Sequence, residues 1–282
     1  MYHQISHQLG FKPKKKLGQH FLVDEGVLER ILSAAELSHK DIIVEVGPGI
    51  GTLTQELVKQ AGKVIAVELD SSLVTILKKR FAPFPNTTII HTDILKITPE
   101  QLLRDNSTLP EAIQDYKVIA NLPYYITSPA LRHFLEASLK PSMMVVMVQK
   151  EVGEAIAAAP GKMTLLSVRT QFYSKPTIIS HVSAQSFYPP PKVDSVILRL
   201  DIYPEPPIEV SDTASFFDIV IDGFSAPRKQ LRNSLAQSLA IQPGQVALLL
   251  KKAGIEARRR AETLSLEEWL ELWKIFAPLK VS

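Results

Sequence analysis

The 282-residue sequence contains no cysteine. This absence excludes disulfide bonds, thiolate nucleophiles and cysteine-ligated zinc or iron–sulfur sites, so any chemistry must use oxygen and nitrogen groups or a bound cofactor. The chain also lacks an apolar run of the roughly 18 to 20 residues that a membrane span requires, and its first residues lack the apolar core of a secretory signal. We therefore expect a cytoplasmic protein.

The composition is typical of an ordinary folded enzyme, with 45% hydrophobic and 22% charged residues. The length favours one large domain with a smaller one. The net charge of +3 is small, but Lys12, Lys14, Lys15 and Lys16 form a basic run before the first acid, Asp24. Such a run is either a solvated tail or a phosphate contact, and composition alone does not decide between them.

From about Asp41 to Lys150, short β-branched apolar runs alternate with longer amphipathic segments. This alternation is typical of a parallel sheet with helices packed on both faces. The predicted fold is therefore α/β and Rossmann-like, with a mostly parallel sheet. The predicted strands begin at Asp41, Lys63, Thr87, Tyr116 and Met143.

Two further β-rich runs, 177–187 and 193–203, are too close together to hold a crossover helix. They predict an antiparallel addition to the sheet. The proline-rich stretch 203–207 ends this pattern, and the runs after it have helical spacing. We place a domain boundary there, which gives an α/β domain over 1–205 and a small all-helical domain over 206–282.

A glycine-rich turn, Gly47-Pro48-Gly49-Ile50-Gly51, follows the first strand and opens a helix. Glycine lets the backbone turn sharply and approach a ligand closely. A dinucleotide fingerprint has its third glycine one position later, where Thr52 stands, so the spacing disfavours NAD. A turn without a ligand is the alternative, because a lone glycine-rich turn is a weak signal.

Acidic residues follow the next two strands. Glu68 ends the second strand, where doubly wound folds keep a carboxylate for ribose hydroxyls, and Asp93 follows the third strand, where it can accept from an adenine amino group. For Asp70 we favour the role of a helix cap. The glycine-rich turn, Glu68 and Asp93 thus lie at three successive strand ends. Together they predict a pocket for an adenosine cofactor without a pyrophosphate, which describes S-adenosyl-L-methionine.

The fourth strand ends in Asn121-Leu122-Pro123-Tyr124, which indicates the reaction. An aromatic amino nitrogen is a poor nucleophile because its lone pair is delocalised, so acceptors fixed around its N–H bonds favour attack on a methyl group. The Asn121 side-chain oxygen and the Leu122 carbonyl can supply them, while Pro123 stiffens the turn and Tyr124 can stack on the base. An ordinary strand exit is the alternative.

Over nearly its whole length the chain resembles the KsgA family of ribosomal RNA adenine dimethyltransferases, whose members have a Rossmann-like class I methyltransferase domain. The matching stretches are 16–22, 44–54, 67–70, Asn121 to Tyr124, 149–152, 187–195 and 231–235. The resemblance implies that His20, Leu22, Gly47, Gly49, Glu68, Asp93 and Asn121 contact the cofactor, while Tyr124 and Phe187 sandwich the target adenine.

The resemblance also implies a substrate, the N6 amino groups of two adjacent adenosines in the 3′-terminal hairpin loop of small-subunit ribosomal RNA, methylated during ribosome biogenesis. The chain departs from the family at His20, where asparagine is common, and before Arg228, where Pro227 replaces an arginine.

RNA contacts are expected from Lys14, Lys15, Lys16, Arg228, Lys229 and Arg232, because phosphate contacts dominate affinity. For Lys251, Lys252 and Arg258 to Arg260, RNA contact and a solvated face are equally supported. We expect a monomer without a metal.

Three other functions compete with this hypothesis. The macrolide-resistance dimethyltransferases of large-subunit RNA share the fold and the tetrapeptide, although the 187–195 and 231–235 matches favour KsgA. A factor that chiefly binds the immature small subunit would also suit the basic residues. A DNA amino-methyltransferase would need a larger target-recognition insertion than 282 residues provide.

Overall fold

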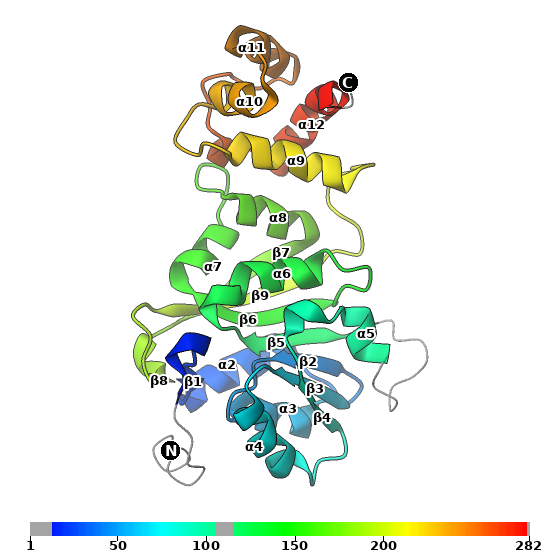
Figure 1. The fold of residues 1–282 in the computed structure, drawn as a ribbon, viewed down its shortest axis with the longest axis vertical. Coiled ribbons are helices and arrows are strands. Elements are labelled where there is room, and N and C mark those ends of the chain that lie inside the picture. Colours follow the sequence, from blue (N-terminus) through cyan, green and yellow to red (C-terminus); the bar gives the residue numbers. More distant parts are fainter. Residues whose placement is uncertain (1–12, 105–114, 281–282) are drawn as a thin grey trace. The chain divides into compact units, whose positions relative to one another are not determined.

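The computed structural model describes residues 13–104 and 115–280 of the chain (Figure 1). Contacts divide the chain into two compact units, one formed by Met1–Gly153 with Lys175–Pro204 and the other by Glu154–Ser174 with Glu205–Ser282. The second unit is therefore built from two separate stretches of sequence. Within the described residues, no helix is long and apolar enough to cross a membrane.

The first unit contains a seven-stranded sheet with the order β4-β3-β2-β5-β6-β9-β7. Its strands are β2 (Ile42–Val46), β3 (Lys63–Glu68), β4 (Thr87–His91), β5 (Lys117–Asn121), β6 (Met143–Gln149), β7 (Ser174–Val182) and β9 (Ser195–Ile202). The strands from β4 to β6 pair in parallel, whereas β9 pairs antiparallel with β6. The predicted mostly parallel sheet and its antiparallel addition are confirmed.

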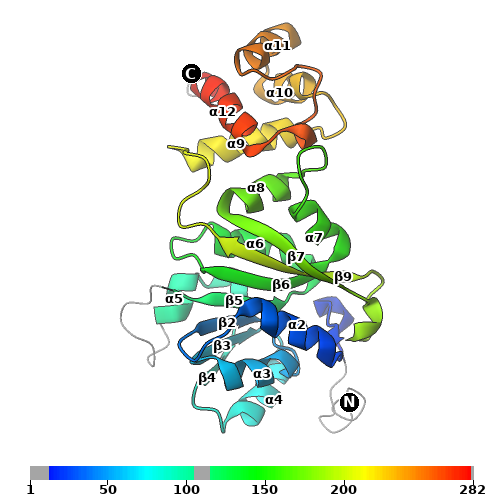
Figure 2. The same cartoon turned by 180° about the vertical axis from the view of Figure 1, so that it is seen from behind.

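Helices cover both faces of this sheet, since α6 lies in front of it in Figure 1 and α2 in front of it in Figure 2. In α4, Leu73, Leu77 and Phe81 are buried while Lys78 and Lys79 are exposed, which is the burial pattern of an amphipathic helix. The helices of this unit are α2 (Glu25–Ala35), α3 (Thr52–Gln60), α4 (Ser71–Phe81), α5 (Pro99–Arg104), α6 (Thr127–Leu135) and the start of α7 (Lys150–Ile156).

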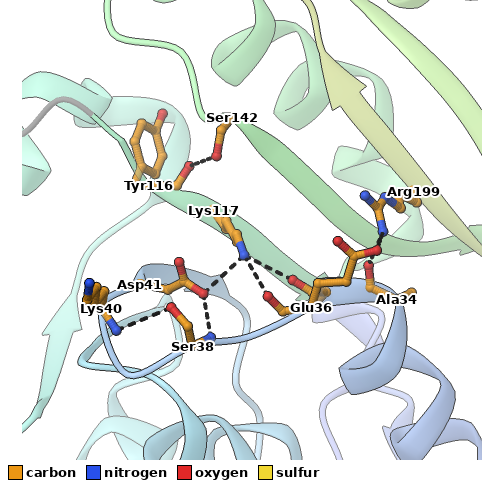
Figure 3. Close-up of polar contacts among 10 residues, drawn as sticks. Ala34, Glu36, Ser38, Lys40, Asp41, Tyr116, Lys117, Ser142 and Arg199 are labelled. Atoms are coloured by element: carbon orange, nitrogen blue, oxygen red, sulfur yellow. Dashed lines mark hydrogen bonds and ion pairs between the residues drawn. The ribbon is translucent and has the colours of Figure 1, made fainter.

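Two cations fasten the end of α2 to the sheet (Figure 3). The Lys117 ammonium donates to the carbonyls of Ala35 and Glu36 at 3.2 and 3.0 Å, and the Arg199 guanidinium donates to the Ala34 carbonyl at 3.0 Å. A helix leaves its last carbonyls without partners, and these cations from β5 and β9 satisfy them. Lys117 starts β5, so this network lies at the amino end of that strand and serves the fold.

The second unit is helical within its described residues. Its complete helices are α8 (Leu165–Tyr173), α9 (Thr213–Phe224), α10 (Leu231–Leu239), α11 (Pro243–Lys252) and α12 (Leu266–Lys280). Aromatic residues form its core: the Phe172 and Phe216 rings stack with centroids 5.3 Å apart, and Trp269 is fully buried against Phe224. The helices predicted after Pro207 are confirmed.

Candidate active site

A cavity of about 250 Å³ lies at the carboxyl ends of the central strands. The strand β2 has β3 on one side and β5 on the other, so the chain reverses its direction across the sheet at this point. Doubly wound sheets bind ligands at such a switch point because the loops diverge there and leave a crevice. The loops after β2, β3, β4 and β5 all line the cavity.

The glycine-rich turn after β2 lines the cavity with Gly47 to Ile50 and needs glycine for two reasons. Gly49 and Gly51 have φ angles of +60° and +84°, in the left-handed region. A Cβ atom on Gly49 would lie 2.9 Å from the Phe21 ring, and one on Gly51 would lie 2.6 Å from the Phe81 ring. The turn is therefore packed so closely against Phe21 and Phe81 that a larger residue at Gly49 or Gly51 would displace these rings.

Two acids predicted from the strand ends line this cavity. The Glu68 carboxylate accepts from the backbone N–H of Asp70 at 2.8 Å and of Gly49 at 3.3 Å. Burial raises the pKa of Glu68, although these backbone donors oppose the rise. Asp93 accepts from the Leu95 N–H at 3.1 Å, which fixes its carboxylate at the cavity edge.

A third acid, Glu45, was missed by the sequence reasoning. It lies on β2, is only 1% exposed, lines the cavity and accepts a 2.6 Å hydrogen bond from the Thr54 hydroxyl. Burial raises the pKa of Glu45 to about 8. An acid inside an otherwise apolar strand was the available signal, because such a group is rarely buried without a purpose.

The charges around the cavity favour a cationic ligand. Its lining includes the acids Glu68 and Asp93, while Glu45, whose pKa burial raises to about 8, is mainly protonated at neutral pH. No lysine or arginine is among the described residues that line it. A pyrophosphate would meet these carboxylates without a cationic side chain beside it, whereas a sulfonium with an ammonium group is attracted by them. The residues present therefore fit S-adenosylmethionine and disfavour a dinucleotide.

The tetrapeptide Asn121 to Tyr124 forms the wall of the cavity beside these acids. The Asn121 side-chain nitrogen donates to the His20 carbonyl at 3.0 Å. This bond fixes the amide orientation, so that its oxygen is the group left to accept from a ligand. Pro123 precedes the short 3-10 helix η3 (Tyr124–Ile126), which presents Tyr124 to the cavity.

Tyr124 is held at its hydroxyl and on its ring. The hydroxyl lies 2.7 Å from the Ser195 hydroxyl, and the ring stacks on the His20 imidazole with centroids 5.9 Å apart and planes 25° apart. Burial raises the pKa of Tyr124, so its phenol stays protonated at neutral pH. Tyr124 therefore offers an aromatic surface and no charge.

The segment before β1 (Phe21–Leu22) forms another side of the cavity. Leu17 to Leu22 line it, which includes both His20 and Leu22. Asp70 anchors this segment: its carboxylate accepts from the Lys14 ammonium at 2.6 Å and from the Gln19 amide at 3.1 Å. Asp70 also caps α4 by accepting from the Ser72 N–H, so the predicted cap role is confirmed.

The predicted basic run is only partly described. Lys12 and the side chain of Lys15 lie outside the described residues, and Lys16 is exposed. Lys14 is paired with Asp70, yet 47% of its side chain remains exposed. Contact of Lys14, Lys15 and Lys16 with RNA stays a prediction.

The structure does not bring Phe187 to the cavity. This residue begins β8 (Phe187–Tyr188), pairs with Leu22 of β1 and is 3% exposed within the core. Among the described residues, it is not one of those that line the cavity. Tyr125 does line it and is 56% exposed, with its ring close to Gly18. The role of Phe187 stays a prediction.

The basic residues predicted on the helical side lie in the second unit, around the start of α10. Arg228 and Lys229 are exposed, and Arg232 is half-buried with an Nε that has no hydrogen-bond partner among the described residues. Arg259 is instead bound to Glu268 of α12, which gives it a structural role. Lys251, Lys252, Arg258 and Arg260 are exposed.

Comparison with known proteins yields a consistent result. Residues 10–278 match the family described as ribosomal RNA adenine dimethylase. A protein of Dehalococcoides mccartyi, ribosomal RNA small subunit methyltransferase A, is 50% identical over 94% of this chain and 89% of its own length.

Two solved structures resemble the chain along nearly their whole length. A dimethyladenosine transferase from Plasmodium falciparum has a TM-score of 0.77 and 26% identity, covering 93% of this chain and 98% of that one. The 23S rRNA methyltransferase ErmE has a TM-score of 0.70 and 27% identity, covering 90% of this chain and 98% of that one.

Proposed function

The chain belongs to the ribosomal RNA adenine dimethylase family, and from this membership we propose that it transfers methyl groups from S-adenosylmethionine to adenosines of small-subunit ribosomal RNA. The substrate groups are the N6 amino groups of two adjacent adenosines in the 3′-terminal hairpin loop. The observation that carries the proposal is the cavity lined by acids, with the Asn121 to Tyr124 wall beside them.

Two of the cavity's acids, Glu68 and Asp93, have a defined task toward the cofactor. Glu68 accepts from the ribose hydroxyls, Asp93 accepts from the adenine amino group, and Gly47 and Gly49 let the backbone pass close to the ligand. His20, Leu22 and Asn121 complete the contacts. S-adenosylmethionine supplies an electrophilic methyl group on a sulfonium, and the carboxylates of Glu68 and Asp93 complement its positive charge.

The tetrapeptide prepares the acceptor nitrogen. The Asn121 oxygen and the Leu122 carbonyl accept from the two N–H groups of the adenine, which holds its lone pair toward the methyl group. Tyr124 stacks on the base, and stacking on an aromatic ring is worth about 1 to 3 kcal/mol. Asparagine is not a base, so the amino proton is lost to water after the methyl group has been transferred. Phe187 would have to reach the base from its position in β8.

An unpaired loop suits this site better than a duplex, because the base must leave its stack to enter the cavity. The surrounding phosphates need cationic partners, which Lys14, Lys15, Lys16, Arg228, Lys229 and Arg232 supply. Their distribution over two separate parts of the sequence suits a folded RNA within an immature small ribosomal subunit.

The experiment that tests the function uses unmethylated ribosomal particles. Purified protein with isotopically labelled S-adenosylmethionine should convert adenosines of small-subunit particles to N6,N6-dimethyladenosine, and mass spectrometry of RNA fragments should place the label in the 3′-terminal hairpin loop. Large-subunit particles provide the matched control and should stay unlabelled. Label confined to large-subunit RNA would contradict the proposed substrate, and no label in either RNA would contradict the activity.

We expect the replacement of Arg228, Lys229 and Arg232 by glutamate to lower RNA affinity about 10- to 100-fold and to reduce the slope of log affinity against log salt by about 2 to 3, because three phosphate contacts are lost. Filter binding over a salt series measures both quantities. A control with the same charge reversal at the exposed Lys59, Lys78 and Lys79 should keep the wild-type slope. Equal losses in the two variants would show that only net charge matters.

A further inference from the structure

Two residues, His20 and Ser195, hold the ring of Tyr124. Both depend on one stretch of chain, the 187–195 segment (Phe187 to Ser195): Ser195 is part of it, and His20 is hydrogen-bonded to it. At one end of this segment, the Pro189 carbonyl lies 2.6 Å from Nδ1 of His20, and a carbonyl can only accept, so His20 donates. The same imidazole stacks on Tyr124. At the other end, the Ser195 hydroxyl lies 2.7 Å from the Tyr124 hydroxyl.

Ser195 places a polar hydroxyl at a fully buried strand position. It is fully buried at the start of β9, where it pairs with Gln149 of β6. A buried hydroxyl is costly unless it is hydrogen-bonded, and the partner that the structure gives it is the Tyr124 hydroxyl. An alanine or valine would fill this buried strand position without that cost. The hydrogen bond to Tyr124 therefore accounts for the serine.

We propose that Ser195 is a positioning residue for methyl transfer, which holds the Tyr124 ring in the plane against which the acceptor adenine stacks. This inference rests on the proposed function. Tyr124 lies on a 3-10 helix of only three residues, so its short element does not by itself fix the ring. The bond to Ser195 restrains the ring from its far end, because β9 is paired with β6 from Ser195 to Asp201.

This restraint matters most for the second methyl transfer. A base that already carries one methyl group has a single N–H left and must be turned before its lone pair faces the donor again. A ring free to tilt would accept more orientations of this bulkier base, so fewer of them would be productive. Loss of the Ser195 hydroxyl should therefore slow both transfers and leave monomethyladenosine as an accumulating product.

The experiment compares Ser195→Ala, Tyr124→Phe and the double variant on small-subunit particles. Each single variant should lower kcat about 5- to 10-fold, which is the effect of one neutral hydrogen bond, and should raise the ratio of monomethyl to dimethyl product. The double variant should match the single variants, because both substitutions remove the same bond. Affinity for S-adenosylmethionine, measured by calorimetry, should stay within about 2-fold of wild type.

Ser186→Ala is the matched control. Ser186 is also a buried serine just before the same segment, but its hydroxyl donates to Asp24 at 2.8 Å and does not contact Tyr124. Its loss should lower the melting temperature without changing the product ratio. Tyr124→Phe should melt below the double variant, because it leaves the buried Ser195 hydroxyl unpaired.

The outcomes separate this inference from the function on which it rests. Independent losses that multiply in the double variant, or an unchanged product ratio in Ser195→Ala, would overturn the positioning role while the wild type remains active. A wild-type protein that methylates no ribosomal RNA would overturn the proposed function and the positioning role together.

Discussion

Replacing Asn121 by alanine is expected to lower the rate of methyl transfer about 100- to 1000-fold, the range seen when one preorganised hydrogen-bonding group is removed from a transition state. The reason is geometric: the Asn121 amide is held by its 3.0 Å bond to the His20 carbonyl, so its oxygen is fixed as an acceptor for the adenine amino group. Single-turnover methylation of small-subunit particles measures the rate.

Asn121→Asp distinguishes orientation from base catalysis. A carboxylate cannot donate to the His20 carbonyl, so the side chain should lose its fixed orientation and the rate should fall about as far as in Asn121→Ala. If the residue acted as a base, aspartate would instead keep or raise the rate. Binding of both variants to small-subunit particles also tests the competing role of an assembly factor, since undiminished binding would show that recognition does not need the reaction.

Glu68→Ala should weaken S-adenosylmethionine binding about 30- to 150-fold, as expected when a buried acceptor worth roughly 2 to 3 kcal/mol is removed. The substitution leaves the ribose hydroxyls without an acceptor and also releases the N–H groups of Gly49 and Asp70. Calorimetry with the full chain gives the affinity. Glu68→Gln should fall between the wild type and alanine, because one acceptor oxygen remains.

The matched control for Glu68→Ala is Asp41→Ala. The Asp41 carboxylate is another partly buried acid in the first unit, but it is paired with Lys117 at 3.0 Å and is not among the residues that line the cavity. Its loss should lower the melting temperature and spare the affinity. Equal affinity losses in the two variants would show that the effect on binding is a general weakening of the fold.

The pH dependence of binding gives a second check on Glu68. Burial raises the pKa of Glu68 above its ordinary value, so its proton is taken up at a higher pH than in a solvated carboxyl. Protonation removes the negative charge and one acceptor oxygen. The affinity for S-adenosylmethionine should therefore fall as the pH is lowered through this raised pKa, and Glu68→Gln should lose that component of the dependence.

The strand ends could be predicted because their signals are local. A run such as residues 64–67 is apolar and largely β-branched, and the polar residue that ends it must lie at the edge of a parallel sheet. This places Glu68, Asp93 and Asn121 at one edge from the sequence alone, and the structure confirms that all three line one cavity.

The contacts that were missed join distant parts of the chain. β1 and β8 are two residues each and pair across more than 160 positions, so no periodicity reveals that Phe187 is enclosed beside Leu22. The bond between Lys14 and Asp70 likewise spans 56 positions. Glu45 was different, because its signal was local: a single acid within a buried strand, which pattern reading treated as part of the sheet.

The composition of the second unit limits where the chain can be divided into fragments. Its core includes Phe172 of α8, which stacks on Phe216 of α9, and Arg169 of α8, which lies 4.6 Å over the Phe217 ring. A fragment that begins at residue 206 would lack α8 and leave both phenylalanines uncovered. Residues 205–282 alone therefore cannot be exchanged between relatives as a folded unit. Residues 154–174 must be moved together with them.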